Sequence, residues 1–434
     1  MEKISEGQQM HDLMKELFPI TRSITGEGVR QTLRILKEIH PELEIKSVKS
    51  GERCFDWIVP KEWKIDDAYL LEVETGRKVI DFKRSNLHVV NYSVGVDKTL
   101  TFEELKNHLH YREDLPDAIP YVTSYYNPYW GFCLTYNQYK ELDRNKTYRA
   151  VIKARHFDGE LNYGELVIKG KSSKEIFFST YICHPSLAND NLSGPVLATY
   201  LAKWIKENLK DRNYTYRFVF IPETIGAICY LSRNLKHLKE NVIAGFVLTC
   251  VGDEGRFSYL PSRYGNTLAD KVALNLLNYD PLVGGNYKKY SYLDRGSDER
   301  QYCAPGVDLP VCLIMKSKFG EYKEYHTSLD NLDFVTPKGL QESFDLYRKV
   351  IEVLEHNKVY KTTVLCEPQM GRRGLYHKIS HRGRKGFVKL LMDFLAYADG
   401  TNDLIDIANI LKVSAHSLIE VADLLKRHDL IEEV

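Results

Sequence analysis

The sequence has almost no net charge, few cysteines and no long hydrophobic run. Its 60 lysines and arginines against 59 acidic residues leave a formal charge of +1, so no overall field favours nucleic acid or an acidic partner. The eight cysteines contain no Cys-x-x-Cys pair, which is typical of reduced thiols in a cytosolic protein. No stretch approaches the roughly 20 apolar residues that span a bilayer, and the N-terminus lacks the apolar segment of a signal peptide. We therefore expect a cytoplasmic protein with no membrane partner.

The order of predicted helices and strands indicates three kinds of segment. The 434 residues suffice for two or three domains. Residues 54–148 form short alternating strands and predict an inserted all-β domain. Residues 1–53 and 149–362 alternate apolar strands with helices, which predicts a discontinuous α/β domain with a mixed, largely parallel sheet covered by helices. Residues 366–434 predict three helices of a winged helix-turn-helix module.

Several predicted strands of the α/β domain end in titratable residues. Ligands of open α/β sheets bind outside the carboxyl ends of the strands, so these residues are expected to meet there. They are His184, Glu223, Asp253, Glu254 and His326, with Asp190 on the loop after His184. Two histidines and a carboxylate are a common ligand set for Zn²⁺, and a further carboxylate would serve as general base. A single histidine at the end of a strand is usually a surface or core residue. Several strand-end histidines and carboxylates in one domain, however, favour a metal site.

Four segments then resemble, in the right order, the motifs of the M28-type zinc aminopeptidases. They span residues 178–336 and read CHPSLANDNLSGP, FVFIPETIGAICYL, RGSDERQYCAPGVDLPV and YHTSLDNLDFV. More narrowly, LFPITRSITGEGVRQTL, TSYYNPYWGFC and the C-terminal module resemble bacterial aminopeptidase-like proteins. Those proteins carry an inserted β domain of unknown function (DUF2172/DUF4910 type) and a C-terminal winged helix. The resemblance covers nearly the whole chain and implies a zinc-peptidase fold.

The resemblance also implies roles for individual residues. His184 and His326 would be zinc ligands, Asp190 the carboxylate that bridges two zinc ions in the peptidases, and Glu223 the general base. The resemblance thus implies a zinc-dependent hydrolase of aminopeptidase type that acts on a peptide or a small amide.

Two departures from the peptidase pattern change the expected metal content. Thr224 stands where the peptidases have a second glutamate ligand, and Thr249 where they have an aspartate ligand. A second dication would then be poorly neutralised. We therefore expect one zinc ion per chain, held by the two histidines and Asp190 with water in the fourth position.

Further residues are candidates for substrate binding. Asp253 and Glu254 are either substitute ligands or part of a solvated turn, and Asp298 either meets a substrate amino group or caps the next segment. The ring-rich stretch either packs inside the β domain or forms an aromatic lid over the pocket. An arginine of the N-terminal turn would hold an anionic group of the substrate. The lid would use Tyr126, Tyr129 and Trp130, and the arginine is Arg22.

The sequence does not identify the partner of the C-terminal module. A basic cluster precedes its first helix, formed by Arg372, Arg373, Lys378, Arg382, Arg384 and Lys385. The candidate recognition helix has no Arg, Asn or Gln in its first turns, where base contacts would come. Docking or formation of a homo-oligomer is therefore favoured over binding of nucleic acid.

Alternatives to an aminopeptidase remain. One is an amidohydrolase or deacylase that acts on a sugar or a small metabolite. Another is a degenerate protein that binds a ligand without turnover and interacts through its winged helix. Retention of Glu223 favours catalysis, because a binding module has no use for a general base.

Overall fold

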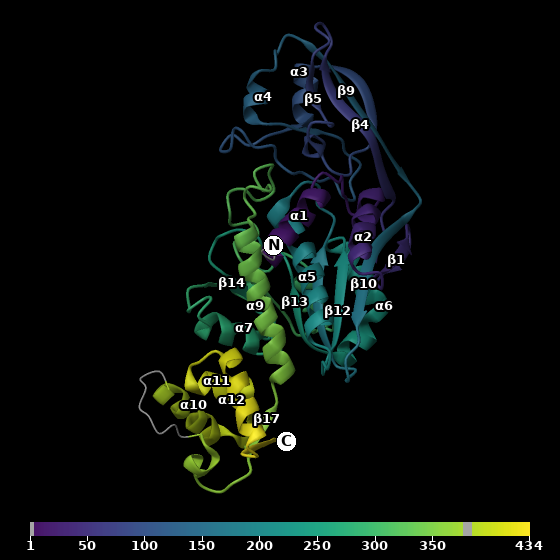
Figure 1. The fold of residues 1–434 in the computed structure, drawn as a ribbon. Coiled ribbons are helices and arrows are strands. Elements are labelled where there is room, and N and C mark those ends of the chain that lie inside the picture. The colour runs from purple at the N-terminus through teal and green to yellow at the C-terminus, as the bar shows by residue number, and fades with distance from the viewer. Residues whose placement is uncertain (1–3, 376–383) are drawn as a thin grey trace.

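The computed structural model describes residues 4–375 and 384–434, and for residues 384 and 385 it describes the backbone only. The chain forms three parts in a row (Figure 1). An α/β domain lies in the middle, a β-rich domain at one end, and a helical module that contains the C-terminus at the other. The long helix α9 (Pro337–His356) runs along the middle domain toward the C-terminal module.

The middle domain is built on an eight-stranded mixed sheet. Its inner strands β12, β11, β13 and β16 run parallel, whereas β1, β10 and β14 pair with antiparallel neighbours. Nearly every residue of the inner strands is buried, as expected where helices cover both faces of a sheet. In sheet order the strands are β1 (Glu44–Lys49), β10 (Glu160–Ile168), β12 (Thr215–Ile221), β11 (Glu175–Tyr181), β13 (Val242–Val247), β16 (Val311–Met315), β14 (Ser258–Leu260) and β15 (Lys288–Lys289).

Two hydrophobic cores lie on opposite faces of this sheet because neighbouring residues of a strand point to opposite sides. Phe178 and its stacked neighbours Phe218 and Phe246 belong to one core, and Phe177 belongs to the other. The first core is covered by α1 (Glu6–Leu17), α2 (Glu27–Ile39), α5 (Ser193–Asn208), α7 (Leu268–Tyr279) and α9. The second is covered by α6 (Ile225–Asn241) and the short α8 (Glu299–Tyr302).

The inserted domain is an antiparallel sheet in the order β5-β4-β9-β6, with its own hydrophobic core. Its strands are β4 (Glu62–Glu72), β5 (Lys78–Asp81), β6 (Val96–Thr101) and β9 (Thr147–Phe157), flanked by α3 (Phe102–Leu105) and α4 (Tyr136–Lys140). The expected boundary at residue 148 falls inside β9, which pairs with β4 and β6 over its length. The inserted sheet therefore extends to Phe157, one short turn before β10 of the main sheet begins.

In its described residues, the C-terminal module contains three α-helices and a small sheet. The helices are α10 (Arg384–Tyr397), α11 (Leu404–Leu411) and α12 (Ala415–Arg427). The central strand β17 (Val359–Thr362) pairs with β18 (Asp399–Asp403) and β19 (Ile431–Glu433). The module thus begins directly after α9, a few residues before the expected start at 366.

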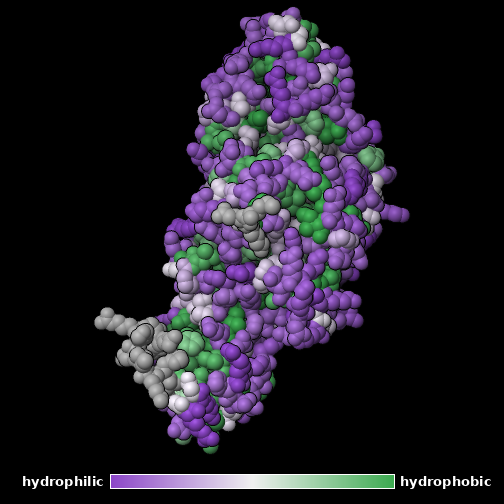
Figure 2. All heavy atoms as spheres, viewed as in Figure 1, coloured by the Kyte–Doolittle hydropathy of each residue, from purple (hydrophilic) through white to green (hydrophobic). Residues whose placement is uncertain are grey.

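The face of the molecule shown in Figure 2 is mainly hydrophilic, with hydrophobic residues gathered in small patches over the middle and lower parts. In the part of the chain that the structure describes, no helix is both long and apolar enough to cross a membrane.

Candidate metal centre

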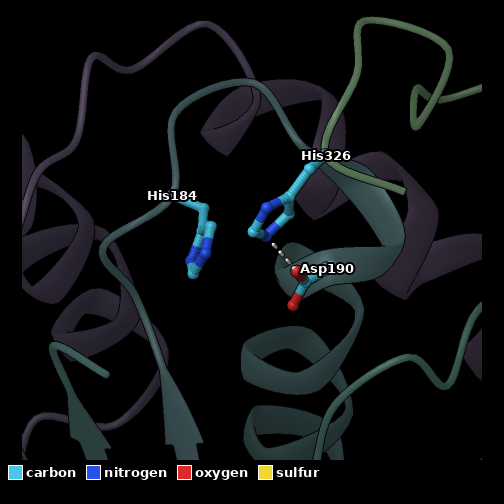
Figure 3. A group of neighbouring side chains, drawn as sticks. All are labelled: His184, Asp190 and His326. Carbon is cyan, nitrogen blue, oxygen red and sulfur yellow. Dashed lines mark hydrogen bonds and ion pairs between the residues drawn. The ribbon is translucent and has the colours of Figure 1, made fainter. Parts of the chain in front are cut away.

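Three side chains that are far apart in the sequence converge at the carboxyl end of β11. His184 follows this strand, Asp190 lies in the distorted turn that leads into α5, and His326 lies in the loop before α9. Their ligand atoms all lie within 4.8 Å of one another, and Figure 3 shows the two imidazole rings side by side, with that of His326 pointing toward Asp190. Among the described residues this is the one group of histidine, cysteine and acidic side chains spaced to hold a metal ion.

Hydrogen bonds fix both oxygens of Asp190. Its Oδ2 lies 3.0 Å from Nε2 of His326. Its Oδ1 accepts a hydrogen bond from the hydroxyl of Tyr181, which also lies 2.8 Å from Oγ1 of Thr249. The backbone N–H groups of Asn189 and Asp190 donate to the carboxylate of Asp330, at 2.6 and 2.9 Å. Hydrogen bonds within the chain therefore orient the carboxylate.

Aromatic rings pack against both histidines. Burial lowers the pKa of His184 to about 4, so its imidazole is neutral and has a lone pair for a metal ion. The ring of Tyr121 lies 5.2 Å from that of His184 and 5.1 Å from that of His326, between centroids. Tyr325 stacks on His326 at 3.9 Å. Both rings are thus fixed toward a common point.

Glu223 lies beside the three candidate ligands. It follows β12, and its Oε2 is 3.8 Å from Nε2 of His184. Burial, followed by the charges of Asp298 and Asp190, raises the pKa of Glu223 well above its usual value. A carboxyl group with a raised pKa next to a metal site is suited to accept and return a proton.

A cavity of about 310 Å³ opens next to this cluster. One wall carries His184, Glu223 and His326, and another is aromatic. Arg300 also lines it, and its Nη2 donates to Oγ1 of Thr224 at 2.6 Å. The remaining lining residues are Ile24, Trp57, Tyr121, Thr123, Tyr125, Tyr126, Cys183, Thr224 and Ile225.

The inserted domain builds part of this cavity. Pro120 forms a β-bridge with Thr327, and the N–H of Tyr121 donates to the carbonyl of His326 at 2.8 Å. The inserted domain therefore contacts the metal cluster directly, and its residues 121–126 supply four of the lining side chains. The sequence signal for this was the ring-rich stretch that begins at Tyr121.

Tyr126 is the one member of the expected aromatic lid that lines the cavity. Tyr129 and Trp130 do not line it. Both stack on His108 within the inserted domain, at 5.5 and 3.7 Å between ring centroids, and the carbonyl of Trp130 is 2.8 Å from Nδ1 of His108. The lid interpretation is wrong for these two residues, because packing against neighbours of their own domain occupies their rings.

Arg22 does not face the cavity. Its side chain is fully buried and donates to the carbonyls of His184 and Leu17, at 2.8 and 2.7 Å. Arg22 therefore supports the histidine loop from behind, and the expectation that it holds an anionic substrate group is wrong for this structure.

The two candidate aspartates have structural partners. Asp253 accepts hydrogen bonds from the amide of Asn189 at 3.0 Å and from Ser317, so it joins two loops and belongs to no ligand group. Asp298 accepts a hydrogen bond from the N–H of Thr224 at 2.7 Å and is fully buried. Burial raises the pKa of Asp298 to about 7. Neither lines the cavity.

The first turn of α12, the candidate recognition helix, is docked on the middle domain. The N–H of Ala415 donates to the amide oxygen of Asn275 at 2.7 Å, and Ser414 donates to Asp280 at 3.0 Å. Nε2 of His416 is 2.7 Å from a carboxylate oxygen of Glu352 on α9. In the basic cluster, Lys378 and Arg382 lie outside the described residues, as do the side chains of Arg384 and Lys385.

Comparison with known proteins gives two family matches. Residues 11–357 match the family described as a domain of unknown function (DUF4910), and residues 358–433 match a winged helix-turn-helix family. The chain is 45% identical over 430 residues to a Clostridium acetobutylicum protein named as a candidate polysaccharide biosynthesis protein with an aminopeptidase-like domain. That match covers 99% of this chain and 97% of that protein.

Two solved structures resemble the whole chain or its main part. A crystal structure of a candidate peptidase from Clostridium acetobutylicum has a TM-score of 0.90 and 44% identity, over 99% of this chain and 96% of that one. A zinc aminopeptidase from Bacillus subtilis has a TM-score of 0.54 and 13% identity, over 81% of this chain and 94% of that one. The second likeness concerns the fold alone.

Proposed function

The chain belongs to the DUF4910 family, with a zinc-aminopeptidase fold and a C-terminal winged helix, and from this premise we propose that it is a zinc-dependent hydrolase that cleaves an amide bond. One observation carries the proposal. The donor atoms of His184, Asp190 and His326 lie within 4.8 Å of one another, and the carboxyl group of Glu223 lies beside them, facing a cavity. Such an arrangement matches a hydrolytic zinc site, in which three protein ligands leave one position open.

The three residues fit a single zinc ion. Two imidazoles and one carboxylate are donors of the kind that Zn²⁺ prefers. The other oxygen of Asp190 is engaged by Tyr181, and Thr224 and Thr249 offer no carboxylate for a second ion. A zinc ion held there would supply Lewis-acid polarisation of a carbonyl group and a lowered pKa for water.

The residues of the chain supply the proton transfers. Glu223 takes a proton from the attacking water while the water oxygen bonds to the amide carbon. The C–N bond then breaks, and Glu223 returns the proton to the leaving nitrogen, so that it ends in its starting state. The aromatic wall with Tyr121 shields this reaction from bulk water.

Substitution of the general base tests the proposal. Glu223→Gln should keep the zinc content of wild-type protein and lose hydrolysis of an acyl-amide and aminoacyl-amide panel by about 100-fold or more. Glu254→Gln is the matched control, because Glu254 is exposed and paired with Lys338. Full activity of Glu223→Gln, or no zinc after zinc loading, would contradict the proposal.

A deacylase that acts on a sugar or small metabolite is the second candidate function. It is favoured by the small cavity with aromatic walls, a surface on which sugar rings stack. The relative named for polysaccharide biosynthesis supports the same reading. Assays should therefore include N-acylated sugars beside peptides.

We place the protein in the cytoplasm. All eight cysteines are free thiols, and seven of them are buried, which suits a reducing compartment. Self-association stays a prediction. Light scattering of the full chain, which gives its molar mass in solution, would test self-association.

A further inference from the structure

The cavity beside Glu223 carries a positive charge where an aminopeptidase would need a negative one. We propose that its substrate is a small amide with an anionic group near the scissile bond, held by Arg300, and not a peptide with a free N-terminal amine. This inference rests on the proposed function, because it specifies the substrate class of the same site.

Arg300 has an available charge. It lines the cavity, and its one hydrogen bond with a described residue is the donation from Nη2 to Oγ1 of Thr224, the residue after the general base. Within the part of the chain that the structure describes, its guanidinium makes no ion pair. The adjacent Glu299 is fully buried, and its Oε1 accepts hydrogen bonds from the backbone N–H groups of Gly296 and Ser297. A guanidinium with free donors is a fitting partner for a carboxylate or phosphate.

Among the described residues, no acidic side chain other than the general base Glu223 lines the cavity to receive an ammonium. Glu223 is the one carboxylate in the lining. Asp298 is fully buried behind Thr224 and accepts its N–H at 2.7 Å. An N-terminal amine would therefore meet Arg300 and a bound dication, and both would repel it. An anionic group of the substrate would be attracted by both the Arg300 guanidinium and the bound dication.

The cavity also limits the size of the ligand. Its volume of about 310 Å³ is at the lower end of the range for ligand pockets. At its aromatic wall, Trp57 and Tyr126 meet edge to face at 5.5 Å and remain 37% and 48% exposed. They offer apolar faces to an acyl group or ring. The site fits a small amide better than a polypeptide.

Three probes of similar size and different charge test the inference. N-benzoylglycine is anionic, N-benzoylglycinamide is neutral, and glycine anilide carries a free amine. Each is titrated calorimetrically into zinc-loaded Glu223→Gln protein, where no turnover disturbs the heat of binding. We expect N-benzoylglycine to bind about tenfold or more tightly than its neutral amide, as for a charge-assisted hydrogen bond. Glycine anilide should bind weakest.

Variants of Arg300 assign the preference to this residue. Adding Arg300→Gln should remove the difference between the anionic and neutral probes, and adding Arg300→Lys should keep part of it. Arg295→Gln is the matched control, because Arg295 is exposed in the segment just before α8, stacks on Tyr292 and does not line the cavity. An unchanged preference in Arg300→Gln would overturn the role of Arg300.

The two proposals fail in different ways. Tightest binding of glycine anilide, or no binding of any probe, would overturn the anionic substrate class. Arginine-dependent binding of N-benzoylglycine without hydrolysis of any amide by wild-type protein would support the anion site and reject the hydrolase. Hydrolysis of glycine anilide in preference to both benzoyl amides would support the hydrolase and reject the anion site.

Discussion

Tyr181 donates a hydrogen bond to one carboxylate oxygen of Asp190, while the other oxygen lies 3.0 Å from His326. The phenol is itself held by Thr249, whose Oγ1 lies 2.8 Å from the Tyr181 hydroxyl. In a two-metal peptidase site the corresponding aspartate bridges both ions. Here one of its oxygens accepts a hydrogen bond from a neutral donor, which supports the proposal of a single metal ion.

Metal analysis should therefore find one zinc ion per chain. Removing the phenol in Tyr181→Phe frees the carboxylate to rotate, and loss of such a supporting hydrogen bond weakens metal binding by about 10–100-fold. Competition with a chelator measures the affinity, and elemental analysis the ratio. Tyr360→Phe in the C-terminal module is the control, because its hydroxyl donates to the carbonyl of His356 far from the site. Two tightly held ions in wild-type protein would refute this account.

Arg22 should matter for stability more than for substrate binding. Arg22→Met would leave the buried carbonyls of His184 and Leu17 without their donor, at a cost of about 1–3 kcal/mol for each. Urea unfolding should show the loss, and zinc affinity should fall because the histidine loop is less well held. Arg34→Met is the matched control, since Arg34 is exposed and paired with Glu27. Equal stability of both variants would contradict the assigned role.

The sequence predicted those parts of the molecule that depend on short segments. The apolar strands and their helices were visible locally, and so were the strand-end histidines. The end of the inserted domain was not, because β9 and β10 are separated by one short turn and differ only in their pairing partners. Likewise β17 is recognisable as part of the C-terminal module only through its pairing with residues near 400 and 432.

Dependence on contacts between distant segments also explains the errors in the predicted site. Tyr126 and Tyr129 belong to one ring-rich stretch, yet one ring faces the cavity and the other stacks on His108. Residue type could not separate them, because the choice depends on the turn between them. Arg300 was missed because its position in the cavity depends on packing of α8 against the loop after β12, contacts that join distant segments.

The full chain should not bind duplex DNA. The first turn of α12 would have to enter the major groove, but its N–H and side-chain groups are bonded to Asn275, Asp280 and Glu352. Fluorescence anisotropy with random-sequence duplex at low salt should show no saturable binding. Asn275→Leu removes the partner of Ala415 and should lower the unfolding midpoint of the chain. Binding that weakens steeply with salt would instead indicate a basic surface that reads DNA backbone.

The buried carboxyl of Asp298 should make stability fall as the pH rises. Burial raises the pKa of Asp298 to about 7, from a usual value of 3.8. Between these values the unfolded chain has released the proton that the folded chain still binds, so the free energy of unfolding decreases with pH across this window. At about 1.4 kcal/mol per pKa unit, the loss is at most ~4 kcal/mol. Asp298→Asn keeps an acceptor for the N–H of Thr224 and has no proton to lose.

Relative to wild type, Asp298→Asn should therefore gain stability between pH 5 and pH 8. Urea unfolding at intervals across this range measures the difference. Asp294→Asn, an exposed position on the same loop, controls for general effects of removing one charge. A constant difference between Asp298→Asn and wild type at all pH values would show that Asp298 is already ionised at pH 5. Its carboxylate would then be a charge under the cavity that Arg300 has to balance, and the selectivity for anionic ligands would be correspondingly weaker.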